Sequence, residues 1–182
     1  IPWNIVTKYH GFSNKKTIDL FVKYAVTCFE RYKDKVKYWL TFNEINIPCM
    51  GEGGIGNLYG LGLMADEDIK ATSPIKLSDL KSDPQSTFEA LHNEFVASAL
   101  AVQKGHEINP DFMIGNMIAH VTLYPLTPNP KDIFTCYSED NFKNNLCGDV
   151  QVRGEYPTFA YKYFKDHGID TSFITEEDKE II

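Results

Sequence analysis

Apolar residues recur at helical spacing in two long segments of the chain. The first apolar stripe is formed by Ile18, Phe21, Val22, Ala25, Cys28, Phe29 and Tyr32. The second segment runs roughly from Ser86 to Glu107, and its stripe is formed by Phe88, Leu91, Phe95, Ala99 and Val102. Asp83 and Pro84 precede it as a helix N-cap and a first helical residue. The pattern predicts two amphipathic helices.

Two shorter runs of nearly continuous apolar residues follow these helices. Val36–Phe42 comes after the first helix, and the run within "INPDFMIGNMIAHV" comes after the second. Such runs are typical of parallel strands that are covered on both faces. We expect the glycine-rich stretch Met50–Leu63, between the first strand and the second helix, to be irregular. Further helices are expected around Asp132–Asn145 and over Pro157–Asp166.

The predicted order is helix, strand, long loop, helix, strand, long loop and helix, which indicates the α/β class. Both a (β/α)8 barrel and an open doubly wound sheet contain this order. Long loops after the strands favour the barrel, because its active sites are built from those loops. A complete barrel needs ~250 residues, whereas the chain has 182. We therefore expect residues 1–182 to be a single domain, the central portion of a partial TIM (β/α)8 barrel.

Composition and charge exclude several kinds of partner. The net charge of −7, without a basic patch, argues against nucleic acid. No apolar run approaches the ~20 residues of a membrane span, and no signal peptide is recognisable. Cys28, Cys49, Cys136 and Cys147 are far apart and form no C-x-x-C motif, so we expect free thiols and a cytoplasmic location. The chain starts at Ile1 without a methionine, so we expect the natural N-terminus to lie upstream.

Candidate chemistry lies at the end of the first predicted strand, in "YWLTFNEIN". Cleavage of a glycosidic bond needs one carboxylic acid that protonates the leaving oxygen and a second carboxylate on the other side of the sugar. Glu44 could be that acid if aromatic neighbours such as Tyr38, Trp39 and Phe42 favoured its protonated form. Strand alternation would turn only one of Asn43 and Glu44 inward, unless the strand ends or bulges there. A structural carboxylate at the strand end remains the alternative.

The segment "KVKYWLTFNE" resembles the T-F-N-E signature of glycoside hydrolase family 1, and "TFNEIN" is similar to its bacterial 6-phospho-β-glucosidase branch. The flanking segments "ASALAVQKGHEINPDFMIGNMIAHVTLYP" and "DVQVRGEYP" agree with this resemblance. One departure is Gly11-Phe12, where the family usually has "GGW". The resemblance implies a retaining β-glycosidase with Glu44 as acid/base and Asn43 near the sugar 2-hydroxyl. It implies phosphorylated β-linked disaccharides or aryl β-glucosides as substrates, and no metal or cofactor.

The second carboxylate, the nucleophile, is not recognisable in this chain. Ile174-Thr175-Glu176 matches part of the family's nucleophile motif but lacks the following Asn-Gly. We interpret Thr175 as a helix N-cap with acids on the first turn. Two alternatives stay open: a β-glucosidase or β-galactosidase for sugars without phosphate, and a catalytically silent fragment that self-associates through exposed barrel edges.

Other residues have weaker functional interpretations. "GEGGIG", Gly51–Gly56, fits the dinucleotide-binding pattern of an oxidoreductase, but the pattern requires a strand that turns directly into a helix. Asn46–Met50 intervene, and we expect no helix after the motif. His92 and His106 lack metal-ligand spacing and are expected near the edge of the apolar stripe of the second helix, with satisfied hydrogen bonds. His120 and Tyr124, which follow the second strand, are candidates for lining the pocket or for a structural hydrogen bond.

Overall fold

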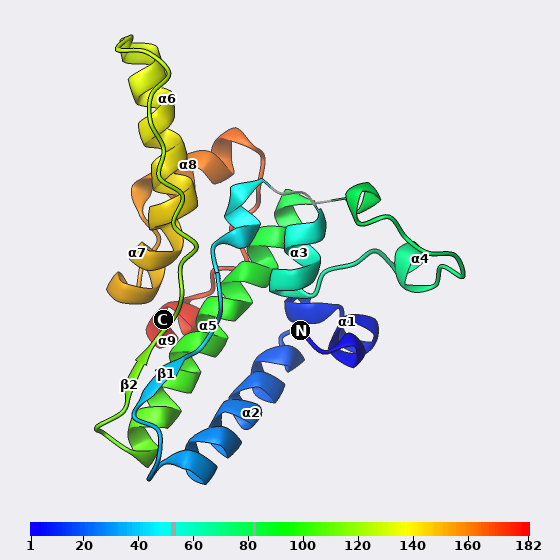
Figure 1. Ribbon diagram of the computed structural model, residues 1–182, viewed down its shortest axis with the longest axis vertical. Coiled ribbons are helices and arrows are strands. Elements are labelled where there is room, and N and C mark those ends of the chain that lie inside the picture. The colour runs from blue at the N-terminus through cyan, green and yellow to red at the C-terminus, as the bar shows by residue number, and fades with distance from the viewer. Residues whose placement is uncertain (52–53, 82) are drawn as a thin grey trace.

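The computed structural model describes residues 1–51, 54–81 and 83–182 (Figure 1). Within these ranges, the strands are β1 (Tyr38–Leu40) and β2 (Met113–Gly115). The helices are α1 (Trp3–Tyr9), α2 (Lys16–Tyr32), α3 (Gly54–Leu61), α4 (Asp66–Ile69), α5 (Pro84–Ile108), α6 (Pro130–Asp140), α7 (Leu146–Arg153), α8 (Thr158–Asp166) and α9 (Glu176–Ile181). Shorter turns are the 3-10 segments η1 (Gly11–Ser13), η2 (Ile47–Met50) and η3 (Leu77–Asp79) and the π turn η4 (Asn141–Asn145).

The long helix α5 runs through the middle of the molecule, with α2 packed along it and the two strands beside it (Figure 1). As predicted, α5 begins after Asp83, whose carboxylate accepts a hydrogen bond of 2.9 Å from the backbone N–H of Ser86. Residues 91–98 of α5 are all buried. This helix therefore supplies most of the surface on which the other elements pack.

The strands β1 and β2 pair in parallel, with Trp39 opposite Ile114. Both of these residues pack toward the helices, where they contact a cluster formed by Ala25, Phe29, Ala101 and Phe112. Gly105 of α5 faces Ile114, and a Cβ atom added there would lie 2.3 Å from the Ile114 Cδ1 atom. The close approach of helix and strand therefore requires glycine at position 105.

The opposite face of this sheet is bare. Tyr38, Leu40 and Met113 have exposed fractions of 75%, 66% and 57%. The expectation that these strands are covered on both faces is therefore wrong for this chain. The physical reason is that α2 and α5 lie on one side of the sheet only, so strand alternation leaves the other side chains in solvent.

The stretch expected to be irregular contains a helix, α3, and this too corrects the sequence analysis. Its three glycines are poor helix formers, but contacts with distant segments stabilise it. The Asn57 side chain donates a hydrogen bond of 2.6 Å to the Thr87 hydroxyl at the start of α5. Gly11 packs so tightly on the end of α3 that an added Cβ would lie 2.1 Å from the Leu61 carbonyl oxygen. Tertiary packing has overridden local propensity here.

The remaining predicted elements need smaller corrections. The helix expected over Asp132–Asn145 is α6 followed by η4, and the chain continues directly into α7. The helix expected over Pro157–Asp166 is α8, which begins one residue later, at Thr158, and ends at Asp166 as expected. Phe12, at the departure from the family pattern, is buried and packs edge-to-face on Phe42 with ring centroids 5.6 Å apart. The substitution has kept an aromatic contact at this position.

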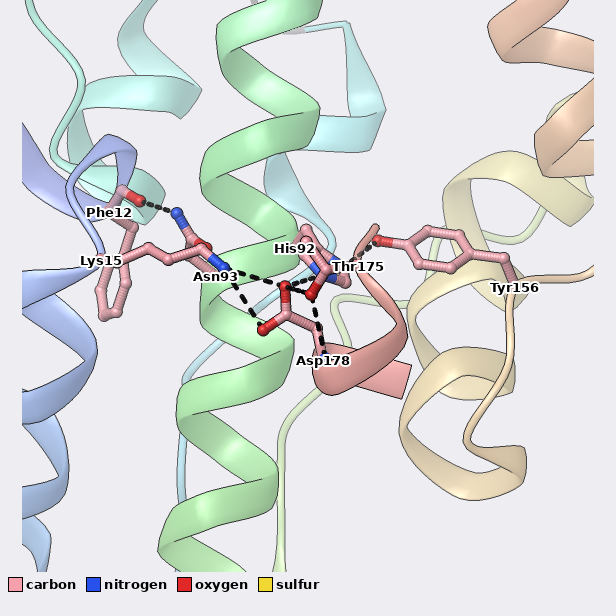
Figure 2. Close-up of polar contacts among 7 residues, drawn as sticks. All are labelled: Phe12, Lys15, His92, Asn93, Tyr156, Thr175 and Asp178. Atoms are coloured by element: carbon pink, nitrogen blue, oxygen red, sulfur yellow. Dashed lines mark hydrogen bonds and ion pairs between the residues drawn. The ribbon is translucent and has the colours of Figure 1, made fainter. Parts of the chain in front are cut away.

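A polar network joins the last helix to the core (Figure 2). His92 of α5 is fully buried, so the expectation that it lies at the edge of the apolar stripe is wrong. Its Nδ1 atom lies 3.0 Å from the Tyr156 hydroxyl, and its Nε2 atom lies 3.4 Å from a carboxylate oxygen of Asp178 in α9. Asp178 also accepts hydrogen bonds from Lys15 (3.0 Å) and from the Thr175 hydroxyl (2.7 Å). The network therefore connects the N-cap residue of α2, the helices α5 and α9, and the segment before α8.

The first prediction concerns the bare face of the sheet. We expect the chain to self-associate at micromolar concentration, because open strand edges and an apolar face remain available for pairing. Replacing Leu40 and Met113 together by threonine keeps strand propensity and should weaken the association. Val152→Thr, on a helix surface with 85% exposure, is the matched control. Sedimentation velocity at several concentrations measures the effect. A wild-type chain that stays monomeric would contradict the prediction.

The second prediction concerns the pH dependence of the network in Figure 2. Burial acts to raise the pKa of Asp178, but hydrogen bonds from Thr175 and Lys15 outweigh it and lower the pKa below its ordinary value. Burial also lowers the pKa of His92, although Asp178 opposes this. Asp178 therefore stabilises the fold above its unfolded pKa of about 3.9 and loses this effect as the pH falls through its folded pKa. His92, kept neutral when folded, costs stability as the pH falls below about 6.5.

Asp178→Asn should therefore lower the free energy of unfolding at pH 7 by about 1–2 kcal/mol, and the difference from wild type should shrink toward pH 3. Urea denaturation at a series of pH values measures both quantities. Glu180→Gln, an exposed change on the same helix, is the control. Equal stabilities of the two variants at pH 7 would contradict the prediction.

Candidate active site

The turn after β1 carries Asn43 and Glu44. Glu44 has a φ of +51°, in the left-handed region that ordinary side chains rarely adopt. Two backbone hydrogen bonds hold this turn: Ile47 N–H donates to the Glu44 carbonyl (2.9 Å), and Ile45 N–H donates to the Met117 carbonyl (3.2 Å). The strand β1 ends at Leu40, so strand alternation no longer applies at Asn43 and Glu44. Both residues line the same pocket.

This pocket has a volume of about 380 Å³ and is lined by Asn43, Glu44, Ile47, Ile55, Gly56, Tyr59 and Gly60. Its two walls are thus the turn after β1 and the helix α3. An acid, an amide and a phenol face a space that also has apolar surface from isoleucine. Such a mixture suits a small molecule with several hydroxyl groups.

The aromatic surroundings of Glu44 differ from those expected. Trp39 packs toward α2 and α5, and Phe42 stacks on Phe21 with ring centroids 4.4 Å apart. Tyr38 lies on the bare face of the sheet. The ring that lines the pocket is Tyr59 of α3, which the sequence analysis missed because it expected no helix there. The spacing of Ile55, Leu58 and Leu61 was the available signal.

Asn46 is the second residue that sequence reasoning missed. Its side chain is fully buried and makes three hydrogen bonds to the backbone. The amide nitrogen donates to the carbonyls of Ala119 (2.9 Å) and Lys143 (2.6 Å), and the amide oxygen accepts from the Ala119 N–H (2.9 Å). The turn that carries Glu44 is thereby fixed to the segment after β2 and to η4.

The segment after β2 places His120 and Tyr124 outside this pocket. Asn144 holds Val121 by hydrogen bonds to its N–H (2.9 Å) and its carbonyl (2.8 Å), so His120 lies between two anchored residues and is exposed. Tyr124 is 83% exposed and borders a separate depression of about 270 Å³ beside α6. In this chain they do not line the pocket that contains Glu44, and a role in the active site of the parent protein stays a prediction.

The glycine motif and Glu176 have structural explanations. Glu52 and Gly53 of the motif lie outside the described residues. A helix, α3, begins at Gly54 within the motif, contrary to expectation. Residues 41–53 nevertheless separate the end of β1 from the start of α3, so the strand does not turn directly into the helix. Thr175 caps α9 as predicted, accepting from the Asp178 N–H at 3.1 Å, and Glu176 is exposed beside Lys179.

Two further observations limit the chemistry of the described ranges. Residues 1–51, 54–81 and 83–182 contain no group of three or more His, Cys, Asp or Glu side chains placed to hold a metal ion. Over the same ranges, none of the helices has the length and apolar character needed to cross a membrane.

Comparison with protein families is decisive, because the model described as "Glycosyl hydrolase family 1" matches residues 1–182. The chain belongs to glycosyl hydrolase family 1. It is 39% identical over 179 residues to the aryl-phospho-beta-D-glucosidase BglA of Bacillus subtilis, covering 98% of this chain and 35% of that protein. It is 41% identical over 181 residues to a 6-phospho-beta-glucosidase of Clostridium longisporum, covering 100% of this chain and 34% of that protein. The chain thus spans about a third of the length of these curated relatives.

Solved structures of this family confirm the predicted fold. A beta-glucosidase from Exiguobacterium marinum superposes with a TM-score of 0.73 at 22% identity, over all of this chain and 38% of that one. The family 1 beta-glucosidase from Thermotoga maritima superposes with a TM-score of 0.69 at 24% identity, covering 93% of this chain and 33% of that one. The family 1 chain is therefore part of a TIM (β/α)8 barrel.

The third prediction tests whether Glu44 occupies a conformation that costs stability. A left-handed backbone conformation disfavours any residue with a Cβ by about 1–2 kcal/mol relative to glycine. Glu44→Gly should therefore be more stable than Glu44→Ala by about 1 kcal/mol, although both remove the carboxylate. Thermal and urea denaturation of the two variants measure the difference. Equal or reversed stabilities would show that the turn is not strained at Glu44.

Proposed function

We propose that the protein containing this chain is a retaining β-glycosidase that hydrolyses 6-phospho-β-glucosides, and that Glu44 is its general acid/base. The observation that carries the proposal is that Asn43 and Glu44 share one pocket at the carboxyl end of β1, where barrel enzymes build their active sites. The chain belongs to a glycosyl hydrolase family, and its curated relatives are named for phosphorylated β-glucosides.

The proposed reaction begins when Glu44 gives its proton to the leaving oxygen of the glycosidic bond. Glu44 then accepts a proton from the water that hydrolyses the glycosyl-enzyme intermediate. Asn43 can accept from one sugar hydroxyl and donate to another, because its amide has both kinds of group. Tyr59, on the opposite wall of the pocket, is placed to contact the sugar ring or its leaving group.

A retaining mechanism needs a second carboxylate ~5–5.5 Å from the first. Among the described residues that line the pocket, Glu44 is the one with a carboxylate, and a second carboxylate is missing from that lining. Glu176 is exposed on α9 and belongs to a helix start. We therefore assign the nucleophile to a part of the parent protein outside residues 1–182, and we expect this chain alone to be catalytically silent.

The proposed preference of the parent enzyme for phosphorylated substrates rests on the names of the relatives and not on any residue of this chain. The same pocket would serve a β-glucosidase or a β-galactosidase acting on sugars without phosphate, which is the second candidate. A sugar phosphate is charged and does not cross a lipid bilayer unaided. We therefore place the parent enzyme in the cytoplasm together with its substrate.

The fourth prediction is tested on the intact parent enzyme. Glu44→Gln should lower kcat/KM for a phosphorylated β-linked disaccharide by about 10²–10⁴-fold, the usual contribution of a general acid. For a 4-nitrophenyl 6-phospho-β-glucoside, the rate of the first step, formation of the glycosyl-enzyme, should fall less than for the disaccharide. The reason is that 4-nitrophenolate leaves without a proton. Azide should restore turnover, since it attacks the glycosyl-enzyme without needing a base.

Glu176→Gln is the matched control and should leave these rates unchanged. Equal losses for both leaving groups, without rescue by azide, would overturn the role of Glu44. Higher kcat/KM for the substrate without phosphate would instead favour the second candidate. Turnover by the isolated 182-residue chain would overturn the assignment of the nucleophile to another part of the protein.

A further inference from the structure

Two cysteines far apart in the sequence lie together behind the proposed catalytic turn. Cys49 belongs to η2, and Cys147 belongs to the first turn of α7, 98 residues later. Their sulfur atoms are 3.9 Å apart, and the two residues are 7% and 1% exposed. A disulfide bond places sulfur atoms about 2.05 Å apart. A shift of about 2 Å, shared between the two side chains, would therefore bring them to bonding distance.

We propose that Cys49 and Cys147 form a reversible disulfide, a covalent modification site that fastens the turn carrying Glu44 to α7. Hydrogen bonds already hold the two segments against each other. Asn46, between Glu44 and Cys49, donates to the carbonyl of Lys143 at 2.6 Å, and the Cys147 sulfur lies 3.9 Å from the Ile45 carbonyl oxygen. The residues just before Cys49 thus contact both Cys147 and the segment that precedes it.

An oxidant has a route to one member of the pair. Cys49 borders a pocket of about 720 Å³ between η2, α6 and α8, which also contains Tyr137, Phe142 and Tyr163. Cys147 lies deeper and is not part of the described lining. The geometry therefore makes Cys49 the thiol that is oxidised first and Cys147 the resolving thiol.

Hydrogen peroxide is an oxidant of the right size and class. The Cys49 thiol reacts with one peroxide molecule to give a sulfenic acid and one water. The Cys147 sulfur then attacks the Cys49 sulfur, the S–O bond breaks, and a second water leaves with the Cys147 proton. Two thiols have lost two electrons and two protons, and peroxide has become two waters. A dithiol reductant reverses the reaction.

The chemistry also predicts the rate and its pH dependence. Burial, followed by the contact with Cys49, raises the pKa of the Cys147 thiol well above its usual value. Because the thiolate is the attacking form, bridge formation should be slow at neutral pH and should accelerate as the pH rises. The bridge itself does not depend on the proposed function. Only the catalytic meaning of fastening the turn that carries Glu44, five residues before Cys49, rests on that proposal.

The test uses the purified chain, treated with hydrogen peroxide, alkylated and digested without reductant. Mass spectrometry should find the peptides of Cys49 and Cys147 linked, and dithiothreitol should separate them. Cys28 and Cys136, which are half-buried, provide the internal comparison and should not be linked to each other. Cys136→Ser is the matched control variant and should still form the bridge.

Two single variants separate the roles of the sulfurs. In Cys147→Ser, Cys49 should accumulate as a sulfenic acid that dimedone traps, whereas Cys49→Ser should leave Cys147 unmodified for longer. The Tm of the wild-type chain should rise on oxidation, because the bridge closes a long loop, and should not rise in either variant. Circular dichroism verifies that both variants are folded. Unlinked Cys49 and Cys147 after complete oxidation of Cys28 and Cys136 would overturn the proposal.

Discussion

The buried amide of Asn46 is the interaction on which the arrangement of the site depends. One side chain satisfies three backbone groups that come from two other parts of the chain. Removing it would leave those groups buried without partners, which typically costs about 1–3 kcal/mol for each group. The turn with Glu44, the segment after β2 and η4 are therefore positioned as one unit, although the sequence separations are 73 and 97 residues.

The same logic extends to the rest of the barrel segment. The helix α5 is buried along most of its length, and its polar residues form hydrogen bonds to segments that are distant in the sequence. Asn93 donates to the Phe12 carbonyl at 2.7 Å, and His92 meets Tyr156 and Asp178 (Figure 2). A pocket wall such as α3 can then contain several glycines, because tertiary contacts rather than helix propensity hold it in place.

The sequence was sufficient for the elements whose signals are local. The amphipathic stripes and the Asp83-Pro84 cap located α2 and α5, and the Thr175 cap located α9, because each signal depends on neighbours within one or two turns. The family resemblance placed Asn43 and Glu44 at a strand end, but it did not contain the left-handed conformation of Glu44 or the pocket that both residues line. Asn46 and the burial of His92 were missed for a common reason. Their partners lie on segments that become neighbours only in the folded chain. Tyr59 was missed because the glycine-rich segment was not expected to form α3.

The network around His92 also has a consequence for the order of assembly during synthesis. Lys15 and Asp178 are separated by 163 residues, and His92 lies between them in the sequence. Until the ribosome has produced Tyr156 and Asp178, the imidazole of His92 in the middle of α5 lacks its final polar neighbours. Domains generally fold as units, and contacts of large sequence separation form late. The His92 side chain therefore reaches its native polar surroundings only after α9 has emerged, whereas α2, which packs along α5, is made before that helix.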